Sequence, residues 1–128
     1  MGCMWLPSEM NGQIMFPEAS KIIDYAIRNG VNFFDVSFIY HRGTVEHFIK
    51  LALTAKYPRE SFYLSDKMPL WPIDNKDNLI AIFNAQLRRC GVEYFDIYLL
   101  HAIDAHTLNI AEQFGAFEFI RQLKEKKE

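Results

Sequence analysis

The sequence has few cysteines, no excess charge of one sign and no long hydrophobic run. Its 128 residues include two cysteines, Cys3 and Cys90, which lie far apart and outside any CxxC motif. This argues against a disulfide scaffold or a zinc ribbon and indicates a reducing compartment, so we expect a cytoplasmic protein. Fourteen Lys and Arg against 16 Asp and Glu give a net charge of −2. The chain therefore lacks the excess of positive charge that is typical of nucleic-acid-binding proteins. No window approaches the roughly 18 consecutive apolar residues of a membrane-spanning helix.

Motifs for phosphate binding and for targeting are also missing. Neither of the common Gly-rich phosphate loops occurs in the chain. The start Met1-Gly2-Cys3 suggests acylation at first sight, but Leu6 stands where the myristoylation pattern requires Ser or Thr. No basic cluster follows to supply a second membrane signal, and no secretory leader can be drawn. We therefore expect no membrane partner.

The chain does contain enough apolar material for one core. Half of its residues are hydrophobic by the broad count, 23% are charged, and there are 11 Phe, six Tyr and two Trp. These values are typical of a folded protein, and the length suits a single domain over residues 1–128.

Short apolar runs alternate with longer amphipathic stretches four times along the chain. The pattern predicts strands over residues 2–6, 31–36, 61–67 and 94–100. It predicts helices from Pro17 to Asn29, from Thr44 to Tyr57, from Asp74 to Cys90, and from near Asn109 to the end of the chain. Helical connections of this length join parallel strands through right-handed crossovers. The expected fold is therefore α/β, built from parallel (β/α) units.

Ionisable residues lie at the carboxyl ends of three of the predicted strands, where parallel α/β sheets hold their reactive groups. Asp35 ends the second strand and Tyr40 lies in the loop that follows; Lys67 ends the third strand, and His101 follows the fourth. Side-chain alternation places Asp35, Lys67 and His101 on the same side of the sheet. Each residue alone is more simply a helix cap, a solvated lysine or a buried histidine. Together they indicate an active site.

These residue types suit proton donation to a carbonyl oxygen. A phenol, with an ordinary pKa of about 10, is a weak acid at neutral pH, and a nearby lysine ammonium lowers the pKa of a phenol. A carboxylate such as Asp35 holds that ammonium in position, and His101 is placed to hydrogen-bond the substrate oxygen or the phenol. Since no side chain supplies hydride, the arrangement implies a nicotinamide cofactor.

Three segments resemble the aldo-keto reductase superfamily: GVNFFDVSFIYHRG (30–43), SFYLSDKMP (61–69) and EYFDIYLLHAID (93–104). The family's catalytic residues are Asp, Tyr, Lys and His, and the matching positions here are Asp35, Tyr40, Lys67 and His101. The resemblance implies a TIM-type (β/α)8 barrel that reduces small aldehydes or ketones to alcohols with NADP(H), with the tyrosine as the general acid.

The start of the chain resembles the family's first strand, whose end lies beside the nicotinamide. Gly2, Cys3 and Met4 match its Gly-x-Met motif, so the resemblance implies that these residues and Asp35 bind the cofactor. One departure lies in the second strand, where the usual Asp-Thr-Ala reads DVS at residues 35–37 and loses a hydroxyl. In another, Asp66 faces the helix layer, where a carboxylate is costly unless it is paired.

The larger departure is length, because a full barrel takes about 250 residues and this chain holds four βα units. We therefore expect the first half of a barrel, without the later strands that carry most of the family's dinucleotide contacts, so that NADP(H) is not retained. Such a half-barrel has open edges and an uncovered inner face, which predicts self-association. Two functions stay open: a carbonyl reductase, or a truncated, non-catalytic half-barrel that self-associates.

Two further groups of residues have weaker interpretations. His101, Asp104 and His106, together with His41 and His47, lack any recognised metal-ligand spacing, so no metal is expected. The two tryptophans follow predicted strand ends and either line a substrate pocket or pack beside neighbouring prolines.

Overall fold

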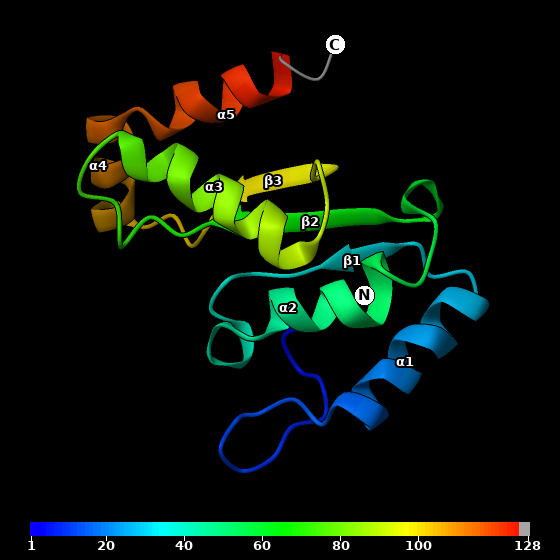
Figure 1. Ribbon diagram of the computed structural model, residues 1–128. Helices are drawn as coiled ribbons and strands as arrows, with labels where there is room; N and C mark the ends of the chain where they lie inside the picture. The colour runs from blue at the N-terminus through cyan, green and yellow to red at the C-terminus, as the bar shows by residue number, and fades with distance from the viewer. Residues whose placement is uncertain (126–128) are drawn as a thin grey trace.

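The computed structural model describes residues 1–125. A three-stranded parallel sheet lies at its centre, and helices pack against it (Figure 1). The described elements, in chain order, are α1 (Phe16–Arg28), β1 (Phe33–Asp35), α2 (Val45–Ile49), β2 (Tyr63–Met68), α3 (Asp77–Cys90), β3 (Ile97–Leu100), α4 (Ala105–Phe114) and α5 (Ala116–Glu125). A π-helical turn, Lys50–Thr54, extends α2 toward the following loop. This architecture confirms the predicted α/β class of parallel βα units.

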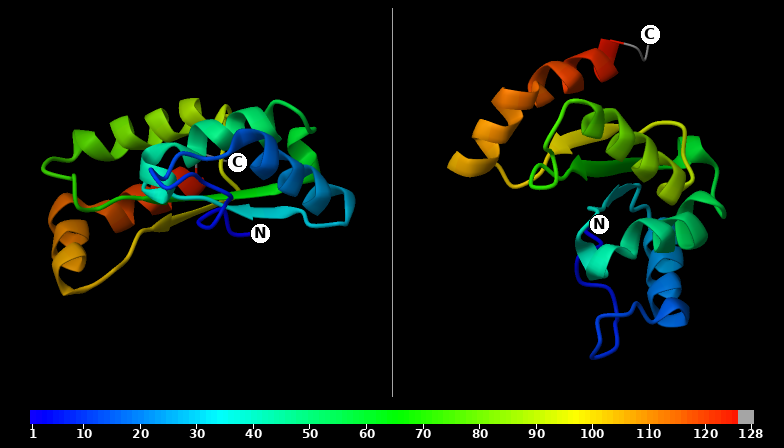
Figure 2. Two further views of the ribbon diagram at one scale, coloured as in Figure 1. Left: turned by 90° about the horizontal axis from the view of Figure 1, so that it is seen from below. Right: turned by 60° about the vertical axis from the view of Figure 1, so that its left-hand side comes forward.

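The three strands lie in the order β1-β2-β3, and both pairs are parallel. Asp35 is in register with Ser65, and Ser65 with Ile97, while Lys67 is in register with Leu99. Because side chains alternate along a strand, these residues share one face of the sheet. The helices α1, α2 and α3 lie against the other face (Figure 2).

The predicted strand over residues 2–6 is wrong beyond its first residue. Only Gly2 pairs with the sheet, in a parallel bridge to Asp35. The Cys3 amide donates to the Asp35 carbonyl at 2.9 Å, and the Asp35 amide donates to the Met1 carbonyl at 2.9 Å. β1 ends at Asp35, so residues 4–6 have no neighbouring strand to pair with.

The last predicted helix is also corrected, because it begins earlier and is divided in two. α4 begins after Asp104, whose carboxylate accepts from the Thr107 amide while the Thr107 hydroxyl accepts from the Asp104 amide, both at 2.8 Å. This reciprocal pair is a capping box, which fixes a helix start. Gly115, with φ of +74°, ends α4 in the left-handed region. α5 then follows in a new direction (Figure 1).

Thr44 occupies the position before α2, as expected, but it does not cap that helix. Its hydroxyl donates to the His41 carbonyl at 2.7 Å. The cap fails because His41 and Arg42 both have positive φ, and the bend they make brings a carbonyl within reach of the hydroxyl.

The main core lies between the sheet and the first two helices. Phe34 and Leu64 point into it from β1 and β2, and Ile23, Ile49 and Leu53 meet them from the helical side, all without exposed surface. Full burial of such a side chain contributes about 1.5–3 kcal/mol. Packing of these apolar faces therefore fixes the positions of β1 and β2 relative to each other. It thereby also fixes the positions of their carboxyl ends.

A second cluster surrounds the ring of Phe83 on α3. The rings of Phe95, Tyr98 and Phe119 lie 6.0, 5.0 and 6.1 Å from it, centroid to centroid, each close to edge-on. Such edge-to-face geometry is favourable for aromatic pairs. These contacts connect α3, β3 and α5.

The sheet face opposite α1–α3 carries large apolar side chains that remain accessible. Phe33, Tyr63, Ile97 and Leu99 are 37%, 55%, 42% and 45% exposed. This face of the sheet therefore presents accessible apolar surface. No helix in residues 1–125 has the length and apolar character needed to span a membrane.

Candidate active site

An ion pair joins the carboxyl ends of β1 and β2. The Lys67 ammonium donates to both carboxylate oxygens of Asp35, at 2.9 and 2.8 Å, and to the Val36 carbonyl at 2.8 Å. The Ser65 hydroxyl donates to Asp35 at 2.9 Å. The two charged side chains keep only 12% and 29% of their surface exposed. The carboxylate thus fixes the ammonium at the sheet edge, which is the arrangement predicted for these two residues.

Tyr40 lies in the short helical turn that follows β1, over the same edge. The Lys67 ammonium is 5.1 Å from the centroid of its ring. The Tyr40 amide donates to the Ser37 carbonyl at 3.0 Å, which ties the turn to the end of β1. A cation at this distance from the ring face is attracted to it. The structure therefore brings the phenol, the amine and the carboxylate together.

His101 completes this group from the end of β3. Its ring centroid is 6.3 Å from that of Tyr40, with the two rings close to perpendicular. Trp71, 43% exposed, lies against the imidazole at 5.5 Å between centroids, so this tryptophan borders the group rather than packing away from it. Burial, followed by the nearby charge of Lys67, lowers the pKa of His101. The imidazole is therefore neutral at physiological pH.

Sequence reasoning missed Ser37, which is fully buried. Its hydroxyl lies 2.9 Å from Nδ1 of His101. The departure from Asp-Thr-Ala at residues 35–37 was interpreted as a lost hydroxyl, yet the serine places a hydroxyl one position later in the same motif. The signal that could have found it is the polar residue itself, two positions after a strand-end aspartate.

The residues matched to the cofactor-binding motif differ in their accessibility. Gly2 is bridged to Asp35, and Met4 is 44% exposed. Cys3 is fully buried, and this burial raises the pKa of its thiol to about 12. Its side chain is thus directed into the core, and only its backbone reaches the sheet edge.

Asp66 faces the helix layer, as its strand position predicts, and is fully buried there. The Lys67 amide donates to its carboxylate at 2.8 Å, and Cys90 Sγ lies 3.8 Å from it. Burial, and then the charge of the buried Glu46, raises the pKa of Asp66. Arg89 forms an ion pair with Glu46, whereas no ion pair joins Asp66 to a cation within residues 1–125.

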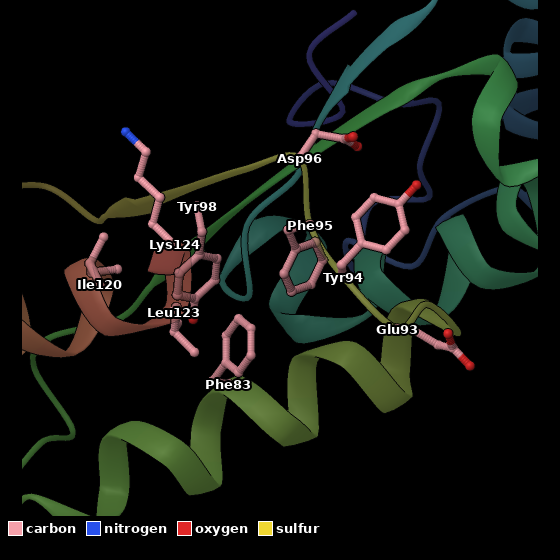
Figure 3. Close-up of a pocket in the computed structure, with 9 residues that line it drawn as sticks. All are labelled: Phe83, Glu93, Tyr94, Phe95, Asp96, Tyr98, Ile120, Leu123 and Lys124. Atoms are coloured by element: carbon pink, nitrogen blue, oxygen red, sulfur yellow. The ribbon is translucent and has the colours of Figure 1, made fainter. Parts of the chain in front are cut away.

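A separate pocket of about 370 Å³ opens between α3, β3 and α5 (Figure 3). The rings of Phe83, Phe95 and Tyr98 lie close together in it, and Leu123 of α5 closes one side. Asp96, which precedes β3, also lines it, so part of the pocket lies at the strand end opposite to His101. The pocket does not belong to the group at the carboxyl ends.

Two of the residues considered as metal ligands have other contacts. His41 Nε2 accepts from the Leu6 amide at 3.2 Å, and Asp104 caps α4. Within residues 1–125, no group of three or more histidine, cysteine or acidic side chains is arranged to hold a metal ion.

The fold and this group of residues define a class of protein, namely a parallel β/α protein with an acid–base cluster at its strand ends. The model of the aldo/keto reductase family matches residues 1–126. The chain belongs to that family. It is 30% identical over 131 aligned positions to YqkF of Bacillus subtilis, described as an uncharacterized oxidoreductase, covering 95% of this chain and 40% of that protein. It is 28% identical over 105 positions to an aldo-keto reductase of Mycolicibacterium smegmatis, covering 81% and 37%.

Solved structures of aldo-keto reductases have the same fold in this region. A Klebsiella pneumoniae enzyme in complex with NADPH aligns with a TM-score of 0.67 at 20% identity, covering 88% of this chain and 39% of that one. A Brucella melitensis enzyme aligns with a TM-score of 0.68 at 19% identity, covering 98% and 44%. The chain thus spans about two fifths of the length of the relatives that it matches.

Proposed function

We propose that this chain carries the acid–base corner of an NADP(H)-dependent oxidoreductase that reduces small aldehydes or ketones to alcohols. The observation that carries the proposal is the joining of Asp35, Lys67, Tyr40 and His101 at one sheet edge. An ammonium held by a carboxylate beside a phenol is a means of making the phenol a proton donor. Family membership supports the same chemistry. We place this activity in the cytoplasm, which suits the two free cysteines.

In this proposal each side chain has a distinct role. Tyr40 donates its phenolic proton to the carbonyl oxygen of the substrate. Lys67 faces the phenol and stabilises the negative charge left on it, and Asp35 keeps the lysine ammonium in place. His101, being neutral, orients the carbonyl oxygen by a hydrogen bond. Trp71 forms an apolar wall beside the imidazole.

The residues present fit the reactive end of a nicotinamide cofactor. Gly2 is bridged to Asp35 and Met4 is 44% exposed, so these three would hold it, with Cys3 contributing its backbone only. NADP(H), when bound, supplies the hydride that reduces the substrate carbon. Because the dinucleotide contacts implied by the family resemblance lie mostly on later strands, we expect residues 1–128 not to retain the cofactor tightly.

The test is NADPH oxidation with a panel of aldehydes and ketones, measured for the protein and for Tyr40→Phe. We expect the phenylalanine variant to lose kcat by roughly 10²–10⁴-fold, the usual contribution of a general acid. Tyr25→Phe, an exposed tyrosine on α1, is the matched control and should keep the original rate. Equal rates for the protein and Tyr40→Phe would refute the assigned acid.

A second candidate function, self-association without catalysis, is favoured by the exposed apolar sheet face. Phe33, Tyr63, Ile97 and Leu99 would be covered by the same face of a second copy. Ile97→Lys should then shift the protein toward monomer in sedimentation velocity. Ile80→Lys, on the outer side of α3 and equally exposed at 44% against 42%, should leave the association unchanged. A protein that is monomeric at all concentrations would refute self-association.

NADPH binding, measured by the change in cofactor fluorescence, discriminates the two candidates when it is combined with NADPH oxidation. A chain that binds the cofactor and turns over carbonyl compounds is an enzyme, whatever its oligomeric state. A chain that associates but neither binds nor oxidises NADPH has only the second function.

A further inference from the structure

Ser37 connects the two proton-bearing side chains of the candidate site. It lies in the loop after β1, without exposed surface. Its carbonyl accepts from the Tyr40 amide at 3.0 Å, and its hydroxyl is 2.9 Å from Nδ1 of His101, which lies 64 residues further along the chain. One buried residue therefore touches both the turn that carries the phenol and the ring that faces it.

The direction of the hydrogen bond between Ser37 and His101 follows from burial. A buried hydroxyl proton without an acceptor is unfavourable, because the group has lost its water partners. Within residues 1–125, the Ser37 hydroxyl has no other hydrogen-bond partner than Nδ1 of His101. The hydroxyl must therefore donate, and Nδ1 must accept through its lone pair. A neutral imidazole that accepts at Nδ1 carries its proton on Nε2.

The remaining contacts of the ring hold its place but do not select a tautomer. Tyr40 and Trp71 contact the imidazole through their rings, at centroid distances of 6.3 and 5.5 Å. The His101 amide donates to the Met68 carbonyl at 3.0 Å, which fixes the backbone only. The serine hydroxyl is thus the single group among these that distinguishes one ring nitrogen from the other.

We propose that Ser37 is a positioning residue that holds His101 as the Nε2–H tautomer, so that the imidazole donates a hydrogen bond to the carbonyl oxygen of the substrate beside Tyr40. This assignment rests on the proposed carbonyl reduction for its consequence, but the tautomer itself does not depend on it. The opposite tautomer would present a lone pair to the substrate oxygen and repel it. Without the hydroxyl, the proton is free to occupy either nitrogen.

The first experiment measures the tautomer directly, by ¹⁵N NMR of the histidine rings in the protein without cofactor or substrate. We expect His101 to show a protonated Nε2 and an unprotonated Nδ1 at neutral pH, with His101→Gln identifying its signals. His41 is an internal reference of the opposite kind, because its Nε2 accepts from the Leu6 amide and its proton must lie on Nδ1. A His101 proton on Nδ1 in the unaltered protein would overturn the proposal, and this result does not depend on whether Ser37→Ala folds.

The second experiment compares Ser37→Ala with Ser65→Ala. Both remove a buried serine hydroxyl from the same sheet edge, but Ser65 donates to Asp35 and not to His101. We expect Ser37→Ala to give His101 ring shifts averaged between the two tautomers, and Ser65→Ala to leave the His101 shifts in place. Unchanged His101 shifts in folded Ser37→Ala would contradict the role of the hydroxyl.

The activity measurement separates this proposal from the proposed function. In NADPH oxidation, Ser37→Ala should lower kcat by roughly threefold to tenfold, the equivalent of one hydrogen bond, with a smaller change in KM. An unaltered kcat in a variant whose tautomer has changed would overturn the catalytic consequence. A protein that is inactive throughout, yet shows the Nε2–H tautomer and its loss in Ser37→Ala, refutes the proposed function and leaves the assignment of Ser37 standing.

Discussion

The ion pair between Asp35 and Lys67 should contribute measurably to folding as well as to chemistry. Lys67→Met removes an ammonium that donates three hydrogen bonds, two to the carboxylate and one to the Val36 carbonyl. It leaves the carboxylate with the Ser65 hydroxyl as its partner. Exposed pairs contribute about 0–1 kcal/mol, whereas breaking a fully buried pair costs about 3–5 kcal/mol. With 12% and 29% of the two side chains exposed, we expect a loss of about 2–3 kcal/mol.

The assay is urea unfolding followed by circular dichroism, for the protein, Lys67→Met, Asp35→Asn and the double variant. Because the two side chains touch, their effects should not add, and we expect a coupling energy of about 1–2 kcal/mol. Arg121→Met breaks an ion pair with Glu118 in which both partners are more than half exposed, and it should change the unfolding midpoint far less. Loss of the lysine at a cost within about 0.5 kcal/mol, the usual range for surface substitutions, would refute a desolvated pair.

Three further predictions concern a buried carboxyl group and the ends of α4. Because burial and Glu46 raise the pKa of Asp66, the folded state binds a proton that the unfolded state releases. The stability that this group contributes is complete at low pH and is lost as the pH rises through its folded pKa, with a slope of up to about −1.4 kcal/mol per pH unit. Asp66→Asn should remove that part of the slope in urea unfolding at a series of pH values. Asp104→Ala removes the capping box and should lower the melting temperature at neutral pH. Since the Thr107 amide and hydroxyl lower the pKa of Asp104, this difference should vanish as the pH falls through that pKa. At Gly115, φ is +74° and no atom lies within 4 Å of an added Cβ. Gly115→Ala should therefore lower the free energy of unfolding by about 1–2 kcal/mol through backbone strain alone. Its melting temperature should be lower than that of the control variant Glu112→Ala.

The sheet was predictable from sequence because short apolar runs alternate along the chain with longer amphipathic helical stretches. Buried Phe34 and Leu64 alternate with Asp35 and Ser65, and this alternation alone placed the charged residues on the face opposite the core. The error at residues 2–6 has a different origin. An apolar run forms a strand only where a neighbour offers free hydrogen-bonding groups, and that neighbour cannot be identified from the run itself.

The division between α4 and α5 was missed because Gly115 lies inside a continuous helical pattern. A single glycine is tolerated in a helix at modest cost, so the sequence does not show whether it bends the chain. The four predicted side chains of the candidate site meet in space, but their catalytic roles remain predictions. Ser37 was missed because its importance depends on a contact with His101 that only the fold creates.

The cluster of rings around Phe83 should give the protein a near-ultraviolet circular dichroism signal that reports on its tertiary packing. Near-ultraviolet circular dichroism depends on aromatic side chains held in fixed asymmetric surroundings and disappears when tertiary packing is lost. Since Phe119 brings α5 to this cluster, detachment of α5 should diminish the signal while the helical far-ultraviolet signal persists. The order in which the outer helix and the sheet come apart can therefore be followed in solution without any label.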